Sequence, residues 1–506
     1  MVPYLRKNFG LIFCLLVIFV LLLIRVSSYK YSRDTAYLID LFRSILFDQS
    51  FYSNIGRVNN LGLHFSPVLI FFSPLYFLGP TGIIFFWKMF CFGSFLIIIW
   101  SLIKNLVGVS EKQKNYLLFL ITLHPTFITN LTNPTIWDID ISLPLLALSI
   151  YFFTDKKYLI STIIFCLTFF VKENMPLVGI FFGIFIILKG KKIIGLSLSI
   201  FSILAFFLIT VIIMPKFSTS GDDLYLLNLN FGYLGNSMGE ALINILKDPS
   251  VILKSGNWLR KIFSIVIMFS CFGFLPFMNR SSLIYLIPGL ITLMYALIAQ
   301  KPFLDYSKHY MLVFFVFLVW SSIHSFYRVN TRTKNKVILF SLISSLTVTL
   351  VLQIYFRTWS YYFFPIPNVE SLKSAAKLIP PKAQLITHGV GSPWVGYNKK
   401  AYILERFQPE KIKNVNPEYI LINLKTVFWE EQSEVEIEIL GTNLRKLNSN
   451  IKYNVLFYEN DIVVLKRKKS LTLESNQVRW SKDLAAFDKM NQIRMKPQFI
   501  RTLRSW

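Results

Sequence analysis

The chain has 506 residues, of which 54% are hydrophobic and only 16% are charged, and its mean hydropathy is +0.53. A soluble domain has about 25% charged residues, so this composition, with its long apolar blocks, excludes an ordinary soluble protein and predicts a multi-pass membrane protein. The formal net charge of +26 is expected from basic cytoplasmic loops and attraction to anionic lipids, and without a nucleic-acid-binding motif we expect no nucleic acid partner.

The first apolar block covers residues 9–26 and follows two basic residues. No small-residue cleavage site comes after it, so we expect a retained signal anchor with a cytoplasmic N-terminus. Residues 27–82 then form the first outer loop. Its second half, NNLGLHFSPVLIFFSPLYFLGP (59–80), is apolar, yet it contains His64, three prolines and a terminal Gly-Pro pair. These residues predict short, interrupted juxtamembrane or re-entrant helices on the outer side.

Further apolar spans follow along the chain. They are expected near 83–104, 116–131, 141–154, 158–171, 175–189, 192–214, 260–277, 283–299, 309–325 and 336–356. Loops at one end of these spans are rich in Lys and Arg, whereas the opposite loop at 132–140 has none. That asymmetry places the basic loops in the cytoplasm, provided that residues 65–104 cross the membrane once. We therefore expect about 11 transmembrane helices within residues 1–358, with a long outer loop at 215–259.

After residue 358 the composition changes. SLKSAAKLI is typical of a short helix stopped by a Pro-Pro pair. AQLITHGV, EYILINL and NVLFYENDIVVLK are typical of strands, the last of them a hairpin that turns at Asn460. We expect a small extracytoplasmic α/β domain at 359–468, followed by a basic, partly disordered tail at 469–506. The predicted fold class is thus an all-α polytopic membrane protein with a small C-terminal α/β domain.

Ionisable residues gather at the outer ends of the predicted spans. A charged side chain at the bilayer centre costs at least about 2.5–3.5 kcal/mol, so ionisable residues near helix ends are candidates for function. The cytoplasmic loops, by contrast, are short and almost purely basic, and they offer few carboxylates for catalysis. The residues gathered on the outer side are Asp34, Asp40, Arg57, His64, Asp138, Asp140, Lys172, Glu173, Asp305, Lys308, His309 and Tyr310.

Each candidate also has a structural alternative. Asp34 could pair with the preceding arginine or cap the helix that follows it, and Asp138 or Asp140 could cap the helix at 141–154. Lys172 and Glu173 could form an exposed ion pair, which contributes little stability. The sequence alone leaves these alternatives open.

A divalent cation is a further alternative for the same residues. Carboxylates together with a histidine suit Mg²⁺ or Mn²⁺, so Asp34, His64 and Asp138 could hold such an ion. The spacing of these residues is specific for no metal. A cofactor is therefore possible and not required.

Several segments in order carry a resemblance to a known family. They are RDTAYLIDLF, LHFSPVLIFFSPLY, LHPTFI, WDID, FFVKEN and SKHYMLVFF, with AAKLIPPKAQLITHG and NPEYILINL near the end. Together they resemble the bacterial domain-of-unknown-function family 2079, whose members are predicted multi-pass membrane proteins. That family is in turn similar to the GT-C superfamily of membrane glycosyltransferases. The resemblance covers roughly residues 9–360 as well as the C-terminal region, and it implies a GT-C-like fold with outer juxtamembrane helices.

The resemblance also implies roles for individual residues. Asp34 matches the first-loop acid that acts in GT-C enzymes as a general base or orients the acceptor. Asp138 or Asp140 matches a second acid from a later outer loop. His64, followed by Phe-Ser-Pro, resembles the polar residue that opens the juxtamembrane helix of those enzymes. The chain departs from the usual paired acids, because Asp34 is flanked by an arginine and a threonine.

The implied reaction transfers a sugar from a polyprenyl-phosphate donor to a lipid, glycan or protein acceptor on the outer face of the cytoplasmic membrane. A carboxylate deprotonates or orients the acceptor hydroxyl, and Arg57, His64, Lys172 or a bound metal stabilises the leaving phosphate. Two other functions stay open: a transporter or flippase for lipid or envelope polymer, and a non-catalytic envelope assembly protein. The remaining substrate-binding candidates are Glu173, His309 and Tyr310.

Overall fold

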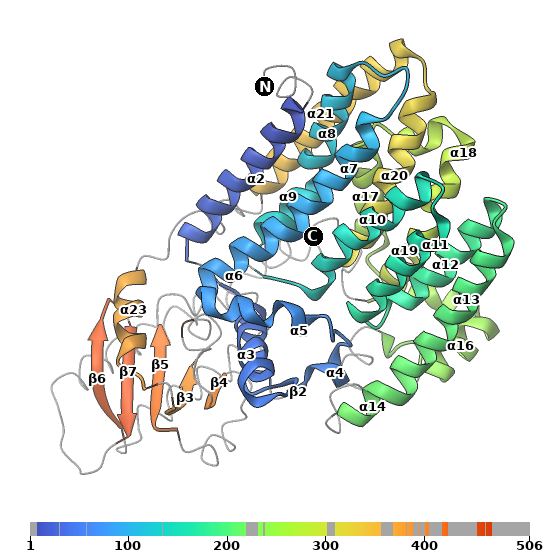
Figure 1. The fold of residues 1–506 in the computed structure, drawn as a ribbon. Coiled ribbons are helices and arrows are strands. Elements are labelled where there is room, and N and C mark those ends of the chain that lie inside the picture. Colours follow the sequence, from blue (N-terminus) through green and yellow to red (C-terminus); the bar gives the residue numbers. More distant parts are fainter. Residues whose placement is uncertain are drawn as a thin grey trace.

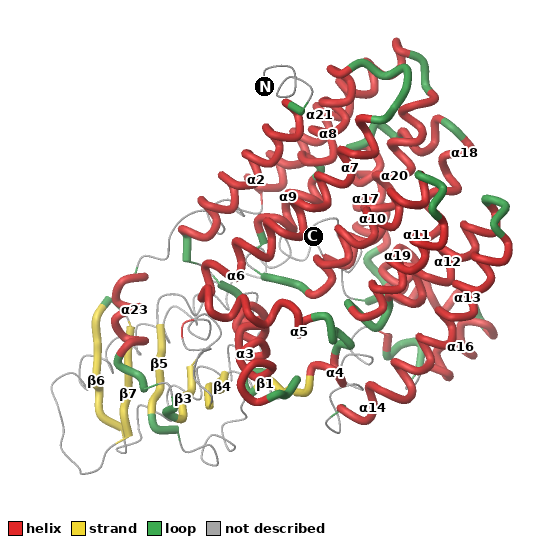
Figure 2. Tube along the Cα trace, viewed as in Figure 1, coloured by secondary structure: helices red, strands yellow, loops and turns green. Residues whose placement is uncertain are grey.

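The structure, a computed structural model, is mostly helical with a small sheet formed by the C-terminal part of the chain. The long helices form one bundle, and the strands of this sheet lie together at one end of it (Figure 1, Figure 2). The tail predicted at 469–506 lies outside the described residues, as do Arg57, Asp305 and Lys308. The described residues are 8–29, 31–56, 58–133, 135–218, 231–235, 238–300, 309–355, 368–380, 382–387, 394, 400–403, 417–423, 453–460 and 462–467.

Apolar helices make up the bundle. They are α2 (Phe9–Ser27), α6 (Gly79–Lys88), α7 (Ser94–Lys104), α8 (Glu111–Leu123), α9 (Pro125–Thr132), α10 (Ser142–Thr154), α11 (Tyr158–Leu167), α12 (Met175–Leu188), α13 (Lys192–Phe207), α17 (Trp258–Ser270), α19 (Ile287–Ile298), α20 (Leu312–Arg328) and α21 (Thr331–Tyr355). Short helical segments extend or connect them: η2 (Met89–Gly93), η3 (Asp138–Ile141), η4 (Thr168–Phe170), η5 (Leu208–Ile213), α14 (Met214–Phe217), α16 (Met238–Lys247), η6 (Pro249–Ser255), η7 (Leu275–Met278), α18 (Arg280–Leu283), η8 (Ile284–Leu286) and η9 (His309–Met311).

Five stretches within the described part of the chain are long and apolar enough to cross a membrane. Other predicted spans form shorter apolar helices, among them Tyr158–Phe170 and Met175–Leu188, whereas the span predicted at 336–356 lies in α21, a helix of 25 residues. The prediction of a helical membrane protein is confirmed, whereas the total of about 11 crossings stays a prediction. The five stretches are Phe9–Ser27, Leu69–Lys104, Lys192–Phe217, Arg280–Ile298 and His309–Arg328.

The apolar segment after Asn59 is interrupted, as its prolines predict. It forms only short helices, α4 (Asn60–Leu63), α5 (Leu69–Phe72) and η1 (Ser73–Leu78). Gly79 then has a φ of 69°, a left-handed conformation that costs glycine little. From Gly79 the chain continues through α6, η2 and α7 as one long apolar helix. The break thus separates short helices from a single long one, which fits one crossing between residues 65 and 104.

One predicted span differs from the structure. The span predicted at 116–131 is two helices, because α8 ends at Leu123 and α9 begins at Pro125. Proline has no backbone N–H to donate, and it disfavours the helical conformation of the residue before it. His124 is accordingly extended, and its Nδ1 accepts a hydrogen bond of 3.2 Å from the Thr126 N–H. The histidine therefore caps α9.

The segment after α2 contains a longer helix, α3 (Arg33–Asp48), and a two-strand ribbon of β1 (Tyr52–Ser53) and β2 (Val58–Asn59). Asp40 on α3 is buried and holds this segment together. Its carboxylate pairs with Arg43 at 3.1 Å and accepts hydrogen bonds from Ser53 Oγ at 2.7 Å and from the Ile55 N–H at 3.1 Å. Asp40 thus stabilises the loop and does not join the other outer acids.

The C-terminal sheet has five strands in the order β4-β3-β5-β7-β6. β3 pairs in parallel with β4 and with β5, whereas β7 pairs antiparallel with β5 and β6. Leu372 of α23 (Val369–Lys377) packs on the sheet with Leu385, Leu421 and Val464. The predicted hairpin turning at Asn460 is confirmed. The strands are β3 (Gln384–Thr387), β4 (Lys400–Ile403), β5 (Tyr419–Asn423), β6 (Tyr453–Glu459) and β7 (Ile462–Arg467).

The sheet lies against the segment of the chain that follows α2. Figure 1 shows α3 beside β4, and Ala36 of α3 forms a buried cluster with Ala401 of β4. Trp394 packs against Tyr29 and Tyr31, with ring centroids 5.9 and 5.5 Å apart. The C-terminal sheet therefore contacts the residues that immediately precede α3.

Candidate functional site

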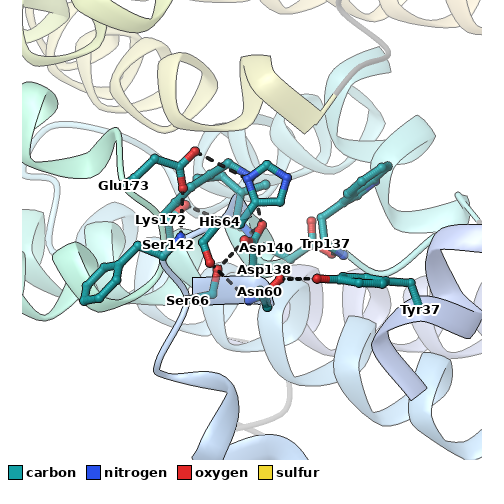
Figure 3. A network of polar contacts seen from close by, with 12 residues as sticks. Tyr37, Asn60, His64, Ser66, Trp137, Asp138, Asp140, Ser142, Lys172 and Glu173 are labelled. Carbon is teal, nitrogen blue, oxygen red and sulfur yellow. Dashed lines mark hydrogen bonds and ion pairs between the residues drawn. The ribbon is translucent and has the colours of Figure 1, made fainter. Parts of the chain in front are cut away.

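His64 and Glu173 meet although 109 positions separate them. His64 directly follows α4 in an extended conformation, and Glu173 lies in the turn before α12. The His64 Nδ1 is 3.4 Å from Glu173 Oε1, and the Phe65 N–H donates to Glu173 Oε2 at 3.2 Å. The Glu173 carboxylate therefore holds both the ring and the backbone at the entrance to the interrupted segment (Figure 3).

Asp138 and Lys172 form the buried part of the same cluster. Asp138 is the first residue of η3, and its Oδ1 lies 3.2 Å from the Lys172 Nζ. Ser66 Oγ donates to Asp138 Oδ2 at 2.5 Å, and the Ile139 N–H donates to Oδ1 at 2.8 Å. Only 7% of the Lys172 side chain and 10% of the Asp138 side chain are exposed. Both carboxylate oxygens of Asp138 are thus engaged.

Both carboxyl groups of the cluster are held in the ionised form. Burial raises the pKa of Asp138, but the nearby Lys172 and His64 and the Ser66 hydrogen bond lower it further, so the net pKa is below its usual value. Burial likewise disfavours ionisation of Glu173, yet the His64 ring and the Lys172 ammonium lower its pKa to about 2. Charge and hydrogen bonding therefore outweigh desolvation at both acids.

Asp34 lies in the first turn of α3. Ser32, and not Asp34, caps the helix, because its Oγ accepts a 3.1 Å hydrogen bond from the Thr35 N–H. Asp34 is half-buried, and its carboxylate forms no hydrogen bond or ion pair with another described residue. Its carboxylate is close enough to the Tyr310 hydroxyl group for the two to interact electrostatically. The capping alternative for Asp34 is therefore not realised.

Aromatic residues from two later helical segments lie beside this cluster. The Tyr310 hydroxyl group lies near the charged groups of Lys172, Glu173 and Asp138, and near Asp34. The His309 ring, which is buried, stacks on Trp137 with a centroid separation of 3.8 Å. The Tyr295 hydroxyl group of α19 lies near the polar groups of Tyr310, Glu173 and Lys172.

Asp140 points into a different environment. Its Oδ2 pairs with Lys88 Nζ at 2.7 Å, and both side chains are fully buried. Trp87 Nε1 and the Trp137 N–H donate to the same oxygen at 3.2 and 3.3 Å. Because one turn of η3 places Asp138 and Asp140 on different faces, only Asp138 joins the cluster with His64. Asp140 accepts the Trp137 N–H as part of a capping box at the start of η3. The α10 helix has no side-chain cap hydrogen bond, so neither acid caps the helix at 141–154 as predicted.

Sequence reasoning did not identify several of the polar residues in this network. Tyr37 donates to Asn60 Oδ1 at 2.7 Å, and Asn60 Nδ2 donates to the His64 carbonyl oxygen at 3.1 Å, which connects α3 to His64 (Figure 3). Ser66 and Tyr295 were missed as well. The only signal for Ser66 was its position beside His64, and Tyr295 lies in an apolar span without any polar pattern.

The donor set does not fit the divalent cation that carboxylates and histidine suggested. Within the described ranges, no three His, Cys, Asp or Glu side chains are grouped so that they could hold a metal ion. Asp138 already contacts an ammonium group, a hydroxyl group and a backbone N–H. The proposed reaction therefore does not use a metal ion. Arg57, the other predicted phosphate ligand, lies outside the described residues.

Comparisons with known proteins agree on fold and family. The family model described as "Predicted membrane protein (DUF2079)" matches residues 42–464. Among solved structures, ArnT from Cupriavidus metallidurans bound to undecaprenyl phosphate is similar with a TM-score of 0.53 at 9% identity, covering 92% of this chain and 100% of that chain. Its apo state gives the same TM-score and identity, with 92% and 99% covered. At 9% identity this likeness shows the fold alone. A comparison with curated proteins found no match.

Proposed function

Since the chain belongs to the DUF2079 family of predicted membrane proteins, we propose that it is a membrane glycosyltransferase using a polyprenyl-phosphate-linked sugar. The acceptor is a lipid, glycan or protein of the cell envelope. The observation that carries the proposal is the meeting of His64, Asp138, Lys172 and Glu173 in one cluster beside the ends of apolar helices. The fold, which is similar to that of the GT-C glycosyltransferase ArnT, supports the same conclusion.

The donor phosphate lies at the cluster on this proposal, with its lipid tail in the membrane. ArnT binds undecaprenyl phosphate, which supports a lipid-linked phosphate as the headgroup here. Lys172 supplies positive charge next to it and the His64 ring lies beside it, and Arg57 is a further candidate. The site faces the outer side of the cytoplasmic membrane, with a cytoplasmic N-terminus and an extracytoplasmic sheet.

Asp34 is the proposed general base. A base must be free to accept a proton, and Asp34 has no hydrogen-bond or ion-pair partner among the described residues. Asp138 is less suited, because its oxygens are occupied and its pKa is held low. Asp34 accepts the acceptor's hydroxyl proton while that oxygen bonds to the anomeric carbon. The bond from this carbon to the phosphate oxygen breaks, and polyprenyl phosphate leaves with the electron pair. A single displacement of this kind inverts the anomeric configuration.

The other residues position these groups. Asp138 and Glu173 orient Lys172 and His64, Tyr310 and His309 line the space beside them, and Asp140 fixes η3 against α6. In this assignment Asp138 is a positioning residue. Asp140 lies away from the substrate.

The decisive experiment is an assay of membranes that contain the wild-type chain or Asp34→Asn, with a radiolabelled polyprenyl-phosphate sugar. General-base catalysis contributes about 10²–10⁴-fold to rate, so Asp34→Asn should lower transfer by at least about 100-fold. Asp155→Asn is the matched control, since Asp155 is exposed and pairs only with Lys157 in the described chain. Full activity of Asp34→Asn would remove Asp34 from the mechanism. Lipid translocation in proteoliposomes without sugar transfer would favour a flippase instead.

A further inference from the structure

An open cavity of about 300 Å³ lies far from the candidate site. α10 and α20 begin beside Asp138 and Tyr310, whereas Thr154 and Arg328 at their other ends line the cavity. Because a helix advances about 1.5 Å per residue, helices of this length separate the two places by about 20–25 Å. Its lining includes Leu102, Asn105, Val107, Ile323, His324 and Arg328. A volume of this size lies at the lower end of the range of small-ligand sites, which is about 300–1,000 Å³.

Two basic side chains lie at or beside this cavity, Arg328 in its lining and Lys189 next to it. Arg328 and His324 line it, and Lys189, which directly follows α12, is joined to them through Tyr285. The Lys189 Nζ donates to the Tyr285 hydroxyl oxygen at 3.1 Å, and the Tyr285 ring lies against His324 in a tilted arrangement at a centroid separation of 4.2 Å. Arg328 is bonded to the hydroxyl oxygen of Ser281.

No carboxylate balances this group in the part of the chain that the structure describes. Neither Lys189 nor Arg328 forms an ion pair there. Burial and then the neighbouring Arg328 lower the pKa of Lys189, as expected for a cation near a like charge. Gathering like charges without a counter-ion is unfavourable, so the arrangement indicates that an anion completes it.

Capping of helix ends offers a simpler explanation for basic residues at C-termini. A capping side chain bonds the last free carbonyl oxygens of its helix. Here Lys189 and Arg328 instead bond hydroxyl groups of Tyr285 and Ser281. These hydrogen bonds of the two cations thus do not cap their own helices.

One wall of the cavity is apolar and open. Leu102 and Ile323 contribute aliphatic surface, and Val107 is 75% exposed. The Asn105 side chain, also exposed, adds an amide donor between the apolar wall and the basic group. An anionic head beside an aliphatic chain matches this combination better than a small inorganic ion does.

We propose that the cavity binds a phosphate-bearing anion, with the phosphate between Arg328, His324 and Lys189. The headgroup of an anionic phospholipid is the favoured source, because its acyl chains would lie along Leu102, Val107 and Ile323. A soluble phosphate shares the head chemistry but leaves the apolar wall uncovered. The site is separate from the proposed glycosyltransferase site and does not depend on that activity.

Native mass spectrometry of the purified full chain tests this proposal. The probes are phosphatidylglycerol, zwitterionic phosphatidylcholine and inorganic phosphate. The test variant is Lys189→Gln with Arg328→Gln, and Lys112→Gln with Lys192→Gln is the charge-matched control, because both control lysines are exposed and outside the cavity. The test variant should bind phosphatidylglycerol about 30-fold more weakly, which corresponds to about 2 kcal/mol. The control should bind like the wild type.

Asn105→Asp provides a second variant, since this exposed position is not needed for packing. Its added negative charge should also weaken binding of phosphatidylglycerol. Binding of inorganic phosphate that requires Lys189 and Arg328, without such dependence for phosphatidylglycerol, would support an anion site with a soluble ligand. Equal binding of phosphatidylglycerol by wild type, test variants and control would overturn the proposal and leave the cations as structural residues.

Discussion

Lys172 Nζ lies 3.2 Å from Asp138 Oδ1, although 34 positions separate the two residues in the chain. Lys172 belongs to the turn before α12 and Asp138 to η3 before α10. The ion pair therefore joins the beginnings of two apolar helices and fixes one wall of the candidate site. Because it is nearly buried, each partner depends on the other for compensation.

A double-mutant cycle should show this dependence. Lys172→Met or Asp138→Asn alone leaves one buried group without its partner, so each should lower the free energy of unfolding by about 3–5 kcal/mol. The double variant should lose less than the sum, with a coupling of about 0.5–3 kcal/mol. Unfolding in mixed detergent and dodecyl sulfate measures these values. Strictly additive losses would mean that the two groups do not stabilise each other.

Glu173 should make the protein sensitive to acid. Its pKa is about 2 in the folded chain, against an ordinary value of 4.5, so the unfolded chain binds the proton more readily. The stability that Glu173 contributes is therefore complete above about pH 5 and decreases as the pH falls towards 2.

Unfolding temperatures in detergent between pH 3 and 7 check this dependence. Glu173→Gln should show a smaller decrease in acid than the wild type. Glu111→Gln serves as the control, because Glu111 is 55% exposed at the start of α8, and it should keep the wild-type profile. Identical profiles for wild type and Glu173→Gln would exclude Glu173 as the source.

The ion pair of Lys88 and Asp140 should matter for folding more than any surface pair. Both side chains are fully buried, so Lys88→Met should cost about 3–5 kcal/mol by leaving a buried carboxylate. The control is Lys157→Met, whose partner Asp155 is 49% exposed, and its cost should stay below about 1 kcal/mol. Comparable losses in the two variants, measured as unfolding free energies, would contradict the burial argument.

Close packing of α12 on α13 predicts a sharp effect at Gly183. A Cβ there would lie 2.2 Å from Ser199 Oγ and 2.6 Å from the Gly195 carbonyl oxygen. Gly183→Ala should therefore destabilise the protein by about 1–3 kcal/mol. At Gly93 the nearest atom to an added Cβ is 3.7 Å away, so Gly93→Ala should be tolerated. Thermal unfolding of both variants tests the contrast, which disappears if the two helices can separate freely.

Features set by local chain chemistry were predictable from the sequence. The hairpin at Asn460 needs a residue that tolerates a left-handed backbone, and Asn460 has a φ of 47°. The interruption at Gly79 likewise follows from the glycine and prolines in that segment. Strand β4 was missed because KAYI is short, begins with a charged residue and lies at the sheet edge, where packing specifies the sequence least.

Partner choice among the ionisable residues was not predictable. Asp138 and Asp140 stand two positions apart in one WDID motif, and nothing local distinguishes them. The two acids have different environments because their partners, Lys88 and Lys172, come from different and distant segments of the chain. The gathering of outer residues was visible in the sequence, but the pairing of His64 with Glu173 exists only once the helices are packed.

The contact of Trp394 with Tyr31 changes how truncations should be interpreted. Tyr31 is buried, hydrogen-bonds Thr81 at 2.6 Å, and stands three positions before Asp34. Removing the C-terminal sheet would therefore strip support from the stretch that carries the proposed base. A deletion of this kind could lose activity for two reasons: the Asp34 carboxylate is misplaced, or an acceptor-binding surface is missing. Substitutions on exposed strand positions, which spare Trp394, distinguish scaffolding from recognition.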